Sequence, residues 1–170
     1  MLAGLALPGT AFCRNGQFLA GKRAISLVNL HTGEELQNLT YWADGSYLPD
    51  ALKRCNWLLR DHRTDDVHRI DPKLFDLVHA IRNRLCSSAP VQIVSGYRSP
   101  ATNQQLRSAS KGVAKHSLHM RGLACDIRLP KRGTSEVWRA ARGMKRGGVG
   151  LYTRSNFVHV DIGRVRYWGS

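Results

Sequence analysis

LACDIRL, residues 123–129, alternates between apolar and polar side chains as a half-buried β-strand does. Asp126 would lie on one face of this strand, while Cys125 and Ile127 would point to the other face. FVHVDI, residues 157–162, alternates in the same way. Two strands of this kind indicate a sheet with one apolar face and one face that carries polar side chains.

The polar face of these two strands predicts a metal site. His159 and Asp161 share a face of the second strand. If the strands are neighbours, Asp126 and His159 come within reach of one ion, and His119, on the loop before the first strand, can fold over as a third ligand. Two imidazoles and one carboxylate are the set that a catalytic zinc ion takes, with a fourth position left for water. Such residues also occur by chance in many chains, so a purely structural role is the alternative.

Apolar patterns along the rest of the chain predict a single α+β domain. Helical patterns come first and short strands later, which favours an antiparallel sheet with the helices packed on one side. The predicted helices cover residues 46–63, a segment opened by Asp71 and Pro72, a segment opened by Ser99 and Pro100, and residues 134–145; the other predicted strands are residues 24–30, 36–42, 91–96 and 149–152.

The chain is strongly basic, because 26 Lys and Arg residues against 12 Asp and Glu residues give it a formal net charge of +14. We therefore expect an anionic partner or substrate, for which nucleic acid, anionic lipid and the bacterial cell wall are candidates. No basic recognition helix or RNA-binding motif is recognisable, which argues against nucleic acid. No run of about eighteen apolar residues is present, so we expect no integral membrane segment.

Two features bear on the compartment in which the protein works. Residues 1–13, MLAGLALPGTAFC, resemble the apolar part and cleavage zone of a secretory signal that lacks its positive start; a buried first strand or helix is the alternative. The folded domain is expected over residues 24–170. The four cysteines have no CxxC spacing, which argues against a thiolate zinc site. They leave a Cys55–Cys86 bridge or, as the favoured alternative, buried free thiols.

Several motifs make the chain similar to a known family. The pattern S-x-H-x-x-G-x-A-x-D at residues 117–126, followed by a strand with H-x-D, resembles the zinc D-Ala-D-Ala metallopeptidase superfamily and is most similar to its YcbK-like murein endopeptidases. This resemblance implies an α+β fold like that of hedgehog and the D-Ala-D-Ala metallopeptidases. Further similar stretches follow one another in the family's order: NLHTGE (29–34), SGYRSPATN (95–103), GVAKHS (112–117), VGLYTRSNFVHVD (149–161) and RYW (166–168).

What the resemblance implies for activity is a periplasmic or secreted zinc peptidase that hydrolyses peptide cross-links between the peptide stems of peptidoglycan. It gives His119, Asp126 and His159 as the zinc ligands. We expect a monomer. The alternative from another class of protein is a non-catalytic, metal-containing domain that binds the cell wall.

The resemblance also suggests residues that meet the substrate. Arg98 matches the family's arginine near the substrate, and its guanidinium suits a carboxylate or a developing oxyanion. From their positions we add Tyr97, beside it on the turn before a helix, and His116, three residues before the first zinc ligand, to the expected substrate-binding set. A solvated loop histidine is the alternative for His116.

The resemblance does not identify a general base. Some members of the superfamily have an acidic residue three positions before the last metal histidine and others have a histidine two positions before it; here these positions are Asn156 and Phe157. Asp161 is our candidate because it shares a strand face with His159. It could instead orient His159, and His116 would then be the next candidate.

Overall fold

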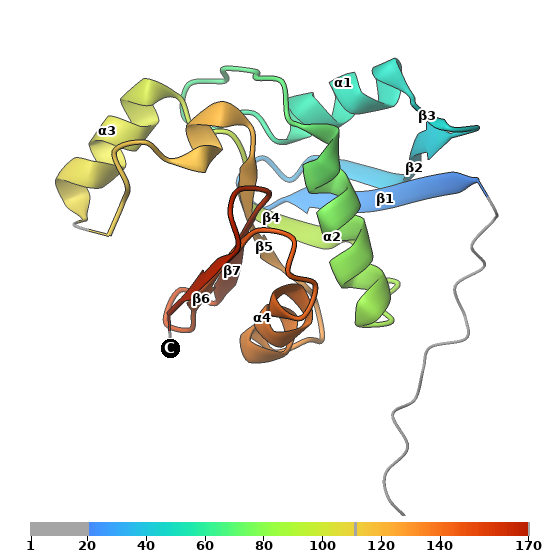
Figure 1. Ribbon diagram of the computed structural model, residues 1–170. Helices are drawn as coiled ribbons and strands as arrows, with labels where there is room; N and C mark the ends of the chain where they lie inside the picture. The colour runs from blue at the N-terminus through green and yellow to red at the C-terminus, as the bar shows by residue number, and fades with distance from the viewer. Residues whose placement is uncertain (1–20, 111, 170) are drawn as a thin grey trace, which may run out of the picture.

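The computed structural model describes residues 21–110 and 112–169, which form one sheet with helices around it (Figure 1). The predicted signal remnant at residues 1–13 lies outside the described residues. The sheet of the described residues has eight strands in the order β3-β2-β1-β4-β5-β7-β6-β8. The strands are β1 (Lys22–Asn29), β2 (Glu35–Ala43), β3 (Ser46–Tyr47), β4 (Val91–Ser95), β5 (Ala124–Arg128), β6 (Gly148–Tyr152), β7 (Phe157–Asp161) and β8 (Arg166–Trp168).

The sheet is mixed, which corrects the predicted antiparallel sheet. β1 runs parallel to β4 and β6 runs parallel to β8, while the other neighbours are antiparallel. Between β1 and β4 the chain forms two further strands and two helices, which supply the long connection that a parallel pair needs. β8 is parallel to β6 because the chain reverses direction after β6 and again after β7.

The helices begin at the residues that the sequence predicts for two of them. The side chains of Asp71 and Ser99 each accept a backbone N–H of the first turn, and Pro72 and Pro100 follow as the first helical residues. α1 and α4 are shorter than the predicted segments 46–63 and 134–145. The helices are α1 (Pro49–Leu58), α2 (Pro72–Arg84), α3 (Pro100–Ala109) and α4 (Thr134–Arg142), with a 3-10 turn η1 (Leu118–Arg121).

One face of the sheet is apolar and holds the core. Cys125, Ile127 and Val160 are fully buried there, in one core cluster with residues from the apolar faces of α1, α2 and α4. α3 is different, because its buried residues are the polar Thr102 and Asn103, and it lies apart from α2 and α4 (Figure 1). The prediction that the helices pack on one side of the sheet therefore holds for α1, α2 and α4 and is wrong for α3.

Two of the cysteines serve packing, while Cys86 is exposed, which corrects the expectation of buried thiols for that residue. Cys55 and Cys125 are buried free thiols, so Cys55 is not bridged to Cys86. Burial raises the pKa of Cys55 to about 12 and holds the pKa of Cys125 well above its usual range, which keeps both thiols protonated and unreactive. Among the described residues, no helix has the length and apolar character that crossing a bilayer requires.

Candidate metal centre

The polar face of the sheet brings two of the predicted ligands side by side. Asp126 on β5 and His159 on β7 are direct cross-strand partners. Their sequence neighbours Cys125 and Val160 form the adjacent pair and point into the core. The alternation seen in the sequence thus places both polar side chains on the face opposite the core, where each is buried.

The turn η1 brings the third predicted ligand over the strands. The Ser117 side chain caps this turn by accepting the backbone N–H of His119 at 3.3 Å. Gly122 ends it with φ +65°, and a Cβ at this glycine would collide with the carbonyl oxygen of Arg69. The tight turn that Gly122 allows leaves the His119 side chain buried above β5 and β7.

Three donor atoms meet at this point. His119 Nε2 lies 3.1 Å from His159 Nδ1, and Asp126 Oδ1 lies 3.3 Å from the first nitrogen and 2.9 Å from the second. Tetrahedral zinc with bonds of about 2.0–2.2 Å holds its ligand atoms about 3.3–3.6 Å apart, so the three atoms are close to the spacing that one zinc ion would impose. The residues present therefore fit the metal that the sequence predicts.

The other nitrogen of each imidazole has an acceptor of its own. His119 Nδ1 lies 2.7 Å from the carbonyl oxygen of Gly96, which can only accept, so this nitrogen carries the hydrogen. His159 Nε2 lies 3.0 Å from Asp161 Oδ2. When both imidazoles are neutral, these bonds leave the lone pairs of His119 Nε2 and His159 Nδ1 available to bind one metal ion together with Asp126 Oδ1. This is the arrangement in which metal-binding histidines are held in proteins.

Burial and the neighbouring charges shift the pKa values in the cluster. Burial lowers the pKa of His119, which favours its neutral form. For His159, burial alone would lower the pKa, but the carboxylates of Asp126 and Asp161 outweigh it and raise the pKa. Burial alone would raise the pKa of Asp126, yet the two histidines hold it well below its usual range. A cation that binds here therefore meets an ionised carboxylate and competes with a proton on His159.

Arg98 holds the second oxygen of the metal carboxylate. Its Nη2 donates to Asp126 Oδ2 and its Nε donates to Ser95 Oγ at 2.9 Å. Asp126 Oδ1 is left to face the two histidines. The Arg98 side chain retains 15% exposure, so it reaches from the buried carboxylate to the cavity above.

A cavity of about 380 Å³ opens over the cluster. Aromatic side chains of Tyr152, Phe157 and Trp168 line one part of it, and the segment before η1, including His116, lines another. Of the predicted substrate-binding residues, Arg98 and His116 thus lie at the cavity. The structure does not bring Tyr97 there, because its ring stacks on His68 with the ring centroids 4.6 Å apart.

Asp161 lies behind the cluster. Its side chain is completely buried, and it does not contribute to the lining of the cavity. Oδ1 accepts the backbone N–H groups of Gly148 at 3.0 Å and Gly163 at 2.8 Å, while Oδ2 faces His159. Arg166 donates to both oxygens, at 3.1 and 2.7 Å. Burial alone would raise the pKa of Asp161, but these partners hold it well below its usual range.

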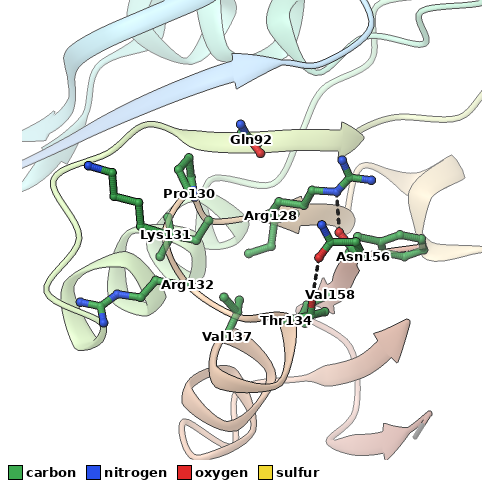
Figure 2. Close-up of a pocket in the computed structure, with 12 residues that line it drawn as sticks. Gln92, Arg128, Pro130, Lys131, Arg132, Thr134, Val137, Asn156 and Val158 are labelled. Carbon is green, nitrogen blue, oxygen red and sulfur yellow. Dashed lines mark hydrogen bonds between the residues drawn. The ribbon is translucent and has the colours of Figure 1, made fainter. Parts of the chain in front are cut away.

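Asn156, at a position where some members of the superfamily carry an acid, serves the fold. Figure 2 shows Arg128 and Thr134 directed at this residue in a separate, smaller cavity. Thr134 Oγ1 donates to Asn156 Oδ1 at 2.6 Å, and Arg128 donates to the carbonyl oxygens of Ser155 and Asn156. These bonds tie the turn between β6 and β7 to the first residue of α4 and to the end of β5.

Two residues at the site were missed by reasoning from the sequence. Arg166 and Trp168 on β8 line the cavity, and the Trp168 ring lies 5.2 Å from the His159 ring, centroid to centroid. A usable signal was their i, i+2 spacing, which puts both side chains on one face of a strand. The glycines at 148 and 150 have the same spacing and lie opposite them across the sheet.

Three converging donors on the floor of an open cavity are the arrangement found in mononuclear metallohydrolases. Comparison with known families makes this class specific. Residues 17–168 match the family described as peptidoglycan L,D-endopeptidase MepK, and the chain belongs to this family. The predicted membership of a murein endopeptidase family is thereby confirmed.

Curated relatives agree with the family. The chain is 42% identical over 146 residues to the peptidoglycan L,D-endopeptidase MepK of Escherichia coli K12, which covers 86% of this chain and 80% of that protein. It is 41% identical over 147 residues to the probable peptidoglycan L,D-endopeptidase MepK of Haemophilus influenzae, with 86% and 78% covered.

Proposed function

We propose that the protein is a zinc-dependent L,D-endopeptidase that hydrolyses peptide cross-links of peptidoglycan in the periplasm or outside the cell. The observation that carries the proposal is the convergence of His119 Nε2, His159 Nδ1 and Asp126 Oδ1 beneath an open cavity. The names of the relatives support the substrate and the type of bond. The net charge of +14 suits an anionic envelope.

His119, Asp126 and His159 would hold the zinc ion. The chemistry that zinc supplies when bound is polarisation of the scissile carbonyl and activation of water. Arg98 fixes Asp126 from behind and reaches into the cavity, where its guanidinium can hold a substrate carboxylate or the developing oxyanion. Arg98 therefore links the binding of the metal to the binding of the substrate.

Proton transfer is assigned to His116. Among the described residues that line the cavity, Asp126 is the only carboxylate, and its oxygens are taken up by the cluster and by Arg98. Asp161 is buried behind His159 with both oxygens accepting hydrogen bonds, which supports an orienting role over that of the base. His116 is an exposed imidazole in the cavity lining, so it can exchange protons with solvent and reach a bound substrate.

The activity is tested by mass spectrometry of the peptides released from purified peptidoglycan, with zinc and with a chelator. We expect cross-linked species to disappear in the presence of zinc only, and the product masses identify the bond that is cut. His119→Ala protein is the control for contaminating hydrolases. Unchanged cross-links with folded, zinc-loaded protein would replace the proposal with a non-catalytic domain that binds the cell wall.

The role of Asp161 is tested with Asp161→Asn. The amide oxygen of asparagine can still accept a hydrogen bond from His159. The substitution removes the negative charge that faces the imidazole. An orienting role predicts weaker zinc binding together with a partial loss of turnover. Full zinc binding with no turnover would return Asp161 to the role of general base.

A further inference from the structure

Two side chains of the edge strand β8 reach across β6 to residues of the metal cluster. Arg166 spans the Asp161 carboxylate with two N–H groups, so its guanidinium fixes the plane of that carboxylate. Asp161 Oδ2 is in turn the partner of His159 Nε2. A continuous chain of three contacts therefore runs from β8 to a nitrogen of the proposed zinc ligand.

A second residue of the same strand touches the same imidazole. The Trp168 ring tilts against the His159 ring, with 5.2 Å between the ring centroids. Trp168 Nε1 donates to the hydroxyl of Tyr152 at 3.0 Å, and the Arg166 guanidinium lies 5.0 Å from the Trp168 ring centroid. His159 is thus restrained at its Nε2 edge and on its ring.

The strand β6 lies between β8 and β7, and it carries glycines at the positions where these contacts cross it. Gly150 on β6 is opposite both His159 and Trp168, and a Cβ there would come within 2.5 Å of the indole. A Cβ at Gly148 would collide with the Asp161 carboxylate and the Arg166 guanidinium. Two glycines at i, i+2 spacing therefore make room for the two β8 side chains, an observation independent of the hydrogen bonds.

We propose that Arg166 and Trp168 are positioning residues of the metal centre: Arg166 orients Asp161 against His159 Nε2, and Trp168 restrains the imidazole, so that Nδ1 faces the metal. The inference rests on the proposed zinc-dependent function and adds residues to it. Partners of this kind set the orientation of a ligand, and their loss weakens metal affinity.

The test is the zinc affinity of the full chain, measured by competition with a chromophoric chelator. We expect Arg166→Met to lower the affinity by about 10-fold, the low end of the range found when the partner of a metal-bound histidine is lost, because Arg166 acts through Asp161. Arg164→Met is the matched control, since it removes the same charge from an exposed side chain and keeps the carbonyl that Arg166 contacts. Its affinity should equal that of the unaltered protein.

A spectroscopic measurement separates positioning from general weakening of the fold. With Co²⁺ as the probe, the visible absorption reports the ligand geometry, and we expect it to change in Arg166→Met and in Trp168→Leu but not in Arg164→Met. Arg166→Lys keeps the charge but cannot span both carboxylate oxygens, so its affinity should lie between those of the unaltered protein and Arg166→Met.

Unaltered zinc affinity and an unaltered Co²⁺ spectrum in folded Arg166→Met would overturn the inference. If that variant does not fold, the same two results in Arg166→Lys and Trp168→Leu would overturn it. These readouts need no substrate. Tight zinc binding without digestion of peptidoglycan would therefore refute the proposed function and leave this inference intact.

Discussion

The two faces of strands β5 and β7 differ in how their side chains are held. On the apolar face, Cys125 and Val160 sit among many similar neighbours, any of which contributes packing. On the polar face, individual side-chain atoms of Asp126 and His159 each have a specific hydrogen-bonding partner. Since the residues alternate along the same strands, one backbone carries both the stability of the fold and the geometry of the site.

From this difference we expect substitutions on the apolar face to change mainly stability, and substitutions on the polar face to change mainly activity. Burying charged groups is unfavourable unless each charge is compensated, and here Arg98 and Arg166 compensate Asp126 and Asp161. The polar face therefore adds little to stability in the absence of a cation, while the apolar face supplies most of it. The first three predictions below test this separation.

The largest effect is expected from His119→Ala. Loss of a zinc ligand removes several kcal/mol of stabilisation of the transition state, so turnover of a cross-linked muropeptide should fall by about 10³-fold or more. Urea unfolding in the presence of a chelator should show a loss of only about 1–3 kcal/mol, because the variant leaves the buried carbonyl oxygen of Gly96 without its partner. Retention of turnover would contradict the assignment of His119 as a zinc ligand.

Ile127→Ala tests the opposite face of β5. Ile127 is 1% exposed in the core, and truncation of a buried isoleucine costs about 2–5 kcal/mol of unfolding free energy. Zinc affinity and turnover per folded molecule should stay close to those of the unaltered protein at low temperature. A variant that is stable yet inactive would show that the two faces are coupled.

His116→Gln should lower turnover by about 10²-fold, the lower end of what a positioned proton-transfer group contributes. Zinc affinity and unfolding free energy should be unaffected, because the side chain is exposed and lies outside the cluster of donors. Steady-state kinetics on a defined muropeptide gives the comparison. Unaltered turnover would remove His116 from proton transfer.

Asp61→Asn is expected to have the smallest effect, on stability alone. Asp61 is a buried carboxylate that accepts backbone N–H groups of Ser99 at 2.8 Å and Arg63 at 3.0 Å. Burial alone would raise its pKa, but its hydrogen bonds lower it to about 2. The ionised carboxylate should therefore contribute about 2 kcal/mol at neutral pH.

This contribution has a defined pH dependence. Because the folded pKa of Asp61 lies below the unfolded value, the stability is fully present above about pH 4 and is lost as the pH falls toward 2. Urea unfolding of both metal-free proteins across this range should show the difference between them shrink. A difference that stays constant with pH would assign it to packing instead of charge.

The sequence carried enough information for the strands of the site and for its proposed ligands. Alternation in LACDIRL and FVHVDI predicted β5, β7 and the face that Asp126 and His159 share. The helix caps at Asp71 and Ser99 were also local signals. Each of these features depends on residues close together in the chain.

Features that depend on tertiary pairing could not be predicted. The parallel neighbours β1–β4 and β6–β8 leave no mark on the pattern of a single strand. Arg166 and Trp168 gain their contacts only through the second pairing. Tyr97 and Arg98 lie next to each other on one turn, and only its path decides that Arg98 reaches the cavity and Tyr97 stacks on His68.

The parallel pairing of β1 with β4 also bears on the order of folding. Leu27 pairs with Val91 across a long intervening chain, and closing such a loop is entropically costly. We expect β5, β6 and β7, which pair through shorter connections, to form first and β1 to join late. Pulsed hydrogen exchange during refolding should protect β5 and β7 amides before those of β1; the reverse order would contradict this. A refolding molecule would then be able to capture its cation before its fold is complete.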